Sequence, residues 1–185
     1  MYKIMGRIEG VAPLLVNRFT EESTESLRTG ATGGRKNEQQ RIDEALLKVY
    51  RDAEGQICVP AKNLKKCLLE GIARARLKEG RASAVPNVQA SVFFEKPDLV
   101  LNKEKPDFIS EEMGRRPPKK GGACLIKRPG FHEGWQLSFT LLVLDDRRDA
   151  ELLHRGMEEA GLLVGIGDHR PEYGRFIVKE WQVVK

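Results

Sequence analysis

Long apolar runs, cysteines and histidines are scarce in this sequence of 185 residues. No stretch approaches the roughly 18–20 consecutive apolar residues that a membrane helix needs. The first residues, Met1 to Gly6, form a charged, alternating segment rather than a secretory signal. The three cysteines are widely spaced and form no CxxC or Cys/His cluster. We therefore expect reduced thiols in a cytoplasmic protein, with no metal, no cofactor and no membrane partner.

Catalytic patterns are equally scarce. No paired carboxylates, Ser/His/Asp arrangement or metal-ligand spacing stands out. Of the three histidines, only His169 lies beside a glycine-rich segment, where it is positioned for acid–base chemistry on a ribose phosphate. We therefore expect a binding protein rather than an enzyme, and His169 is the one catalytic candidate.

Positive charge, in contrast, is present and clustered. The chain has 32 lysines and arginines against 27 aspartates and glutamates, a formal net charge of +5. Lys62, Lys65 and Lys66 open a predicted helix, whose free N-terminal amides also attract phosphate. Such clusters favour a polyanionic partner, although each alone also fits a solvated surface. The second cluster is the run from Met113 to Arg128, which has no acidic residue and six basic ones: Arg115, Arg116, Lys119, Lys120, Lys127 and Arg128.

Hydrophobic periodicity divides the chain into strands and helices. Helical spacing is present over 42–50, 61–80 and 148–160. The last of these helices is expected to begin after Asp145 or Asp146 as N-cap and to end at Gly161. Residues 19–41 lack an apolar period and predict a flexible loop. Alternation with period two predicts strands over 3–9 and 135–144. Short strands are also expected over 56–59, 91–94 and 99–101, and a final strand over 175–184.

The order of these elements indicates the fold class. With its insertions removed, the chain reads strand, helix, strand, strand, helix, strand. This order is typical of the α+β class with an RRM/ferredoxin-like split βαβ antiparallel sheet and two helices on one face. We expect one RRM-like domain over 1–185, with a flexible loop and short helix inserted at about 19–50 and a basic thumb-like arm at about 104–130. The uncovered sheet face and its edge loops would then meet nucleic acid.

A glycine-rich segment connects the last predicted helix to the last strand. Glycine permits positive φ and lets backbone amides approach a bulky anion closely. The alternative is that the glycines only shape a tight connection. A nucleotide-binding loop of the Rossmann or Walker type is not indicated, because the segment follows a helix and lacks GK[ST]. The segment and its flank contain Gly165, Gly167 and Gly174 together with His169, Arg170 and Arg175.

Three stretches together resemble the RAMP superfamily of CRISPR systems, in particular the backbone subunits that polymerise along guide RNA. They are IEGVAPL from Ile8, ICVPAKNLKKCL from Ile57, and the segment from Gly165 to Phe176. The resemblance implies that residues 165–174 line an RNA groove and that the 104–130 arm is a thumb that kinks or separates bases. It also implies contacts to the guide backbone from four residues of the predicted helix: Lys62, Asn63, Lys65 and Lys66.

The sequence thus leads to one expected function and three alternatives. We expect a repeating backbone subunit of a CRISPR-type ribonucleoprotein complex that binds single-stranded, guide-like RNA through its phosphates. Its partners would be copies of itself in a filament and other effector-complex subunits. The alternatives are a guide-processing endoribonuclease of the same superfamily that uses His169, a phage or mobile-element protein that binds single-stranded DNA, and a purely structural assembly protein.

Overall fold

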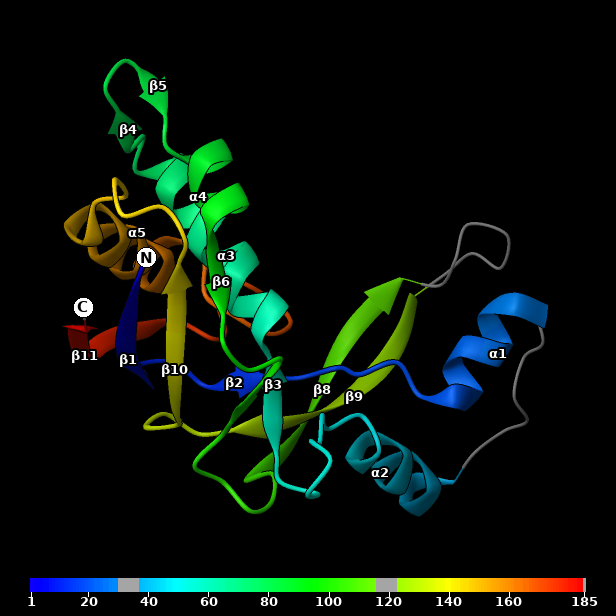
Figure 1. The fold of residues 1–185 in the computed structure, drawn as a ribbon. Coiled ribbons are helices and arrows are strands. Elements are labelled where there is room, and N and C mark those ends of the chain that lie inside the picture. Colours follow the sequence, from blue (N-terminus) through cyan, green and yellow to red (C-terminus); the bar gives the residue numbers. More distant parts are fainter. Residues whose placement is uncertain (30–36, 116–122, 185) are drawn as a thin grey trace.

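The computed structural model describes residues 1–29, 37–115 and 123–184 (Figure 1). It is a mixed α+β structure in which the paired strands are antiparallel. In chain order the elements are β1 (Tyr2–Gly10), β2 (Leu14–Leu15), α1 (Glu21–Thr29), α2 (Glu38–Leu46), β3 (Cys58–Pro60), α3 (Ala61–Arg74), β4 (Lys78–Glu79), β5 (Ala82–Ser83), α4 (Val85–Ser91), β6 (Val92–Phe94), β7 (Asp98–Val100), β8 (Phe108–Arg115), β9 (Ala123–Phe131), β10 (Gln136–Val143), α5 (Ala150–Leu163) and β11 (Phe176–Val184).

The main sheet has four strands in the order β11-β1-β10-β6. The two central strands, β1 and β10, pair along their length, with Ile4 opposite Leu141 and Ile8 opposite Leu137. These positions are fully buried, because alternate residues of a strand point to the same sheet face. The period-two alternation read from the sequence therefore gives one apolar face to this sheet.

Helices α3 and α5 complete the core against that face. The apolar stripe of α3, which includes Leu64 and Leu68, is buried in one cluster with Leu153 and Met157 of α5 and with the inner side chains of β1 and β10. The two helices approach closely at Gly71, where a Cβ atom would lie 2.6 Å from the Cβ of Ala160. Every helix in the described ranges is too short or too polar to cross a membrane.

A long hairpin, β8–β9, projects from this body (Figure 1). Its base pairs with β2, where Leu14 lies opposite Phe131, so that β2, β9 and β8 form a three-stranded sheet. The hairpin occupies the region where the sequence predicts a basic arm. Residues 116–122 lie outside the described residues.

The prediction of a flexible loop over 19–41 is wrong for its described part. Helix α1 lies within that range, and α2 begins there, four residues before the helical spacing predicted over 42–50. Capping by polar side chains explains both helices. Thr20 Oγ1 accepts from the amide of Ser23 at 3.2 Å, and Asn37 and Gln40 form a reciprocal capping box.

The ends of the two main helices also differ from the predictions. Helix α3 ends at Arg74 rather than near residue 80, and the chain continues into the β4–β5 hairpin, which turns at Gly80 with a φ of 63°. The N-cap of α5 is Asp149, which accepts from the amide of Glu151 at 2.9 Å. This helix continues beyond Gly161 to Leu163, since Gly161 packs against Phe176.

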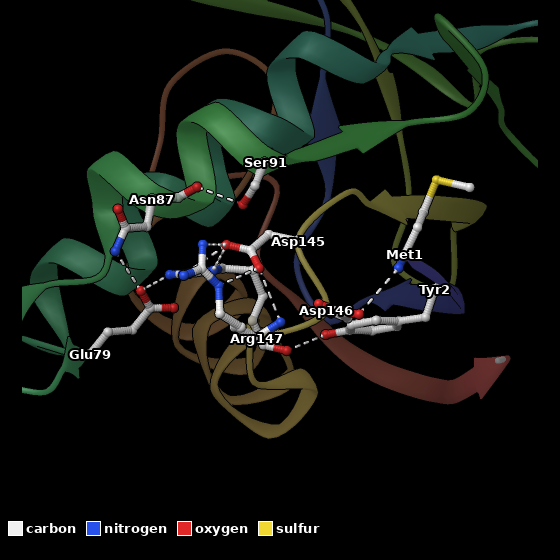
Figure 2. Close-up of polar contacts among 9 residues, drawn as sticks. Met1, Tyr2, Glu79, Asn87, Ser91, Asp145, Asp146 and Arg147 are labelled. Carbon is white, nitrogen blue, oxygen red and sulfur yellow. Dashed lines mark hydrogen bonds and ion pairs between the residues drawn. The ribbon is translucent and has the colours of Figure 1, made fainter.

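Asp145, expected as an N-cap, instead belongs to a cluster of ion pairs at the start of α5 (Figure 2). Its carboxylate bonds the guanidinium of Arg147 at 2.9 Å and that of Arg148 at 3.0 Å. Arg148 also pairs with Glu79 of β4, and Glu79 accepts from the amide nitrogen of Asn87 at 2.6 Å. Through Arg148 and Glu79, the side chain of Asp145 therefore helps to hold the β4–β5 hairpin and α4 against the core.

Candidate nucleic-acid interface

The three segments that carry the predicted site residues are joined by direct polar contacts. Arg128 of β9 donates to the carboxylate of Asp168 in the 165–174 loop at 2.5 Å. The hydroxyl of Tyr173 in the same loop donates to Glu112 of β8 at 3.1 Å. From the other side of the loop, the guanidinium of Arg170 lies 3.8 Å from the carboxylate of Glu70 on α3. The hairpin base, the glycine loop and α3 therefore form one continuous surface.

The glycine loop, residues 165–174, is shaped by close packing against β2 and the residue before it, Pro13. The amides of Asp168 and Gly174 donate to Leu15 and Pro13, each at 2.8 Å. Gly167 and Gly174 have φ angles of 82° and 74°, and a Cβ at either position would overlap a neighbouring carbonyl group. These glycines are needed for the shape of the connection. The amides of Asp168 and Gly174 thus make hydrogen bonds within the protein, so a ligand would meet the side chains of the loop rather than these two amides.

Two of the predicted cations are already neutralised within the protein. Arg128 is only 5% exposed and is held by Asp168. Burial raises the pKa of Asp168, but the hydrogen bond and charge of Arg128 more than offset it, so the pKa of this carboxyl is lowered. Lys127 pairs with Glu111 at 2.6 Å and with Glu38 of α2 at 2.8 Å, and the hydrogen bonds that it donates to both carboxylates raise its pKa.

The lysines at the start of α3 separate into two kinds. Lys62 and Lys66 are exposed, and neither makes an ion pair with any residue that the structure describes. Lys65 instead donates to the carbonyls of Val88, at 2.9 Å, and Val92, which caps the end of α4. Burial lowers the pKa of Lys65 to about 8. Lys65 therefore braces α4, while Lys62 and Lys66 face solvent.

Other predicted residues have mixed environments. Asn63 is half-buried and Arg175 is exposed beside the loop. His169 is half-buried, has a φ of 54°, and its ring lies edge-on to that of Tyr173 with centroids 6.3 Å apart. Arg115 ends β8, and Arg116, Lys119 and Lys120 lie outside the described residues.

Several residues of this surface were not found from the sequence. Glu70 and Arg74 follow Lys66 at intervals of four on α3, so the three share one helix face. Met113 and Leu125, directly opposite each other on the hairpin, are 69% and 59% exposed. The spacing of four along α3 was the sequence signal for Glu70 and Arg74. The pairing of Met113 with Leu125 depends on the strand register, which only the structure gives.

The opposite, uncovered face of the main sheet has a different character. Ion pairs join Lys3 to Glu95 at 2.6 Å and Arg7 to Glu180. The outward positions of β1 and β10 carry no aromatic side chain. A cleft of about 690 Å³ on this face is lined by Met5, with Ser138 and Thr140, among others. Bases stack on aromatic residues in RRM-type binding. On this face the two central strands offer none, and the edge strand β6 offers Phe93, which is 45% exposed and lies in register with Leu142.

The described residues contain no cluster of three or more His, Cys, Asp or Glu side chains able to hold a metal ion. Among them, Cys58 and Cys67 are free and buried, and burial raises the pKa of both thiols, to about 11 and about 12. These two thiols are therefore structural core groups, not candidates for nucleophilic chemistry.

Comparison with known proteins identifies the fold. No protein-family model matches the sequence, and no curated protein sequence is similar to it. Among solved structures, 117 chains match. One is described as the cryo-EM structure of the Type III-B Cmr-beta bound to cognate target RNA, with 14% identity and a TM-score of 0.60. The match covers 100% of this chain and 61% of that one. The chain thus has a fold that also occurs in a CRISPR effector complex, and it spans about three fifths of that neighbour.

Proposed function

We propose that this protein binds single-stranded RNA through its phosphates, as a repeating backbone subunit of a CRISPR-type ribonucleoprotein complex in the cytoplasm. The observation that carries the proposal is the joining of α3, the glycine loop and the hairpin base into one surface. At one end of that surface Lys62 and Lys66 are exposed and unpaired among the described residues. The neighbouring structure was determined with target RNA bound, which supports RNA as the polymer.

The strand order supports a split βαβ arrangement for the main sheet. In chain order its strands are β1, β6, β10 and β11, with α3 before β6 and α5 before β11, and in space they follow β11-β1-β10-β6. We assign residues 1–185 to one RRM-like domain, with insertions at about 19–50 and about 104–130. The second insertion is the arm that contains β8 and β9.

In this proposal the predicted site residues take two roles. One group fixes the shape of the surface: Lys65, Lys127, Arg128, Gly165, Gly167 and Gly174. The other group contacts phosphate: Lys62, Asn63, Lys66, Arg115, Arg116, Lys119, Lys120, His169, Arg170 and Arg175.

The hairpin arm is proposed to act on the bases rather than on the phosphates alone. Met113 and Leu125 form an exposed apolar pair near its outer end, next to the basic run in the sequence. An apolar pair carried on a cationic arm can press between two bases while the cations hold the flanking phosphates. This is the kinking role that the resemblance implies for a thumb.

Binding as a function of salt tests the proposal. If about six phosphates are neutralised, the slope of log K against log salt should be about −4, a loss of a few hundred-fold between 50 and 200 mM. Replacing Lys62 and Lys66 together with Ala should make the slope shallower by about 1.4, since each neutralised phosphate contributes about 0.7. An unchanged slope in this double variant would remove both lysines from the interface.

Competition between RNA and DNA oligonucleotides of equal length separates the proposal from the single-stranded DNA alternative. Tighter binding of DNA would favour the phage-type protein. Binding of neither polymer would favour the purely structural role. Sedimentation with and without RNA tests assembly: growth of the particle with RNA length supports a filament of copies along the strand.

A second candidate function, guide-processing endoribonuclease, is favoured by one observation. His169 lies beside Tyr173, whose hydroxyl bonds Glu112, so an imidazole, a phenol and a carboxylate share one part of the surface. Acid–base groups of this kind can move the protons of a metal-independent RNA cleavage. Cleavage of a structured repeat RNA in EDTA that is lost in His169→Ala would support the enzyme. Intact RNA after long incubation would exclude it.

A further inference from the structure

A small cavity lies between α3 and the glycine loop. Its volume is about 300 Å³, at the lower end of the range for ligand pockets. Glu70 and Arg74 of α3 line one side, and His169, Arg170 and Pro171 of the loop are among the residues that line the other. The cavity opens one helical turn from Lys66, where the proposed RNA path runs. The inference below rests on that proposed function.

The polar groups of the cavity are of opposite charge and only loosely matched to each other. Among the described residues, the carboxylate of Glu70 has one ion-pair contact, with Arg170 at 3.8 Å, beyond hydrogen-bond distance. Arg74 is exposed and makes no ion pair within the described ranges. The charge of Asp168, also in the lining, is held by Arg128. One carboxylate thus needs donors, and one guanidinium beside it needs acceptors.

This combination selects a class of ligand. A phosphate in the cavity would satisfy a guanidinium but leave Glu70 facing an anion, and an apolar group would leave both charged side chains without partners. A nucleobase is neutral and planar and carries donors and acceptors along its edges. Guanine matches best, because its adjacent N1–H and N2–H groups fit the two oxygens of a carboxylate, and its O6 and N7 accept from a guanidinium.

We propose that the cavity takes a single unpaired guanine of the bound RNA, read by Glu70 and Arg74. Sequence-specific RNA recognition commonly uses bases turned out of a single strand and hydrogen-bonded on their edges. The base would enter between the α3 face and the loop, while Lys62 and Lys66 hold the adjacent phosphates. This adds a base preference to a protein that otherwise binds by charge.

The test measures affinity for single-stranded RNA by fluorescence anisotropy. The probes are uridine 12-mers with one central G, A, C, U or inosine, which is guanine without the 2-amino group. The G probe should bind about tenfold more tightly than the A, C and U probes, since one bidentate contact discriminates at about this level. Inosine should fall between G and the others.

Two variants locate the preference. Glu70→Gln has one acceptor oxygen in place of two, and Arg74→Ala removes the donor, so the ratio of G to U affinity should approach one in each. Glu133→Gln makes the same change of charge at an exposed turn outside the cavity, and its ratio should equal that of the wild type. Circular dichroism melts check that each variant is folded.

The outcomes separate this inference from the proposed function. Equal, salt-dependent affinity for all five probes would overturn the guanine site and leave RNA binding intact. A preference for another base, or a G preference that persists in Glu70→Gln, would overturn the assignment to this cavity. Absence of affinity for every probe would overturn both proposals.

Discussion

The ion pair between Arg128 and Asp168 is the contact that fastens the glycine loop to the hairpin, and its removal should have an asymmetric effect. The side chain of Arg128 is 6% exposed, and that of Asp168 is 35% exposed. Breaking a fully buried pair costs about 3–5 kcal/mol, mostly from the charge that is left without a partner. In Asp168→Asn the stranded charge is the buried guanidinium. We expect a loss of about 2 kcal/mol, less than the full value because water reaches Asp168.

The reverse change should cost less. In Arg128→Met the remaining carboxylate is one-third exposed and still accepts from the amide of His169 at 3.1 Å, so we expect a loss of about 1 kcal/mol. Urea unfolding of both single variants and of the double variant measures these values, and the double should lose less than the sum of the singles. Additive losses, or a smaller loss in Asp168→Asn than in Arg128→Met, would refute the reasoning.

The pH dependence of stability gives another test. Because the pKa of Asp168 is lowered in the folded state, its contribution to stability is present above the ordinary carboxyl pKa and is lost as the pH falls through the lowered value. The free energies of unfolding of wild type and Asp168→Asn, measured at a series of pH values, should therefore converge at low pH. Burial lowers the pKa of Lys65 to about 8, so above that pH the unfolded chain binds more protons than the folded one. The contribution of Lys65 to the free energy of unfolding should therefore rise from pH 8 toward 10. Lys65→Met should remove this rise and Lys66→Met should keep it. Gly71→Ala should destabilise by about 2–3 kcal/mol in thermal unfolding, because its Cβ would overlap Ala160, and an unchanged melting temperature would contradict the close approach of α3 and α5.

The sequence was sufficient for elements whose pattern is local. Alternation over 135–144 predicted β10 to within a residue, because alternate side chains of this strand are buried. The final strand expected over 175–184 is β11, which begins at Phe176. The amphipathic stripe of α3 was likewise correct, since Leu64, Leu68 and Ile72 are all buried. Helix α1 and the start of α2 were missed because their stability signals are polar caps, which an apolar period does not reveal.

The division of labour among the cations required the structure. Lys65 and Lys66 are adjacent in the sequence, yet one bonds the carbonyls at the end of α4 and the other faces solvent. Arg128 meets Asp168 across a separation of 40 residues, and no local pattern predicts such a pair. Charge clusters in a sequence therefore indicate where an anion-binding surface forms, but the tertiary contacts decide which of its members remain available.

Photo-cross-linking tests the central claim most directly. The protein is bound to RNA that contains 4-thiouridine and irradiated, and the modified peptides are identified by mass spectrometry. We expect adducts in peptides from the start of α3, around Lys62 and Lys66, and in the 165–175 segment. Adducts confined to the uncovered sheet face, around Met5 and Thr140, would contradict the proposed RNA path.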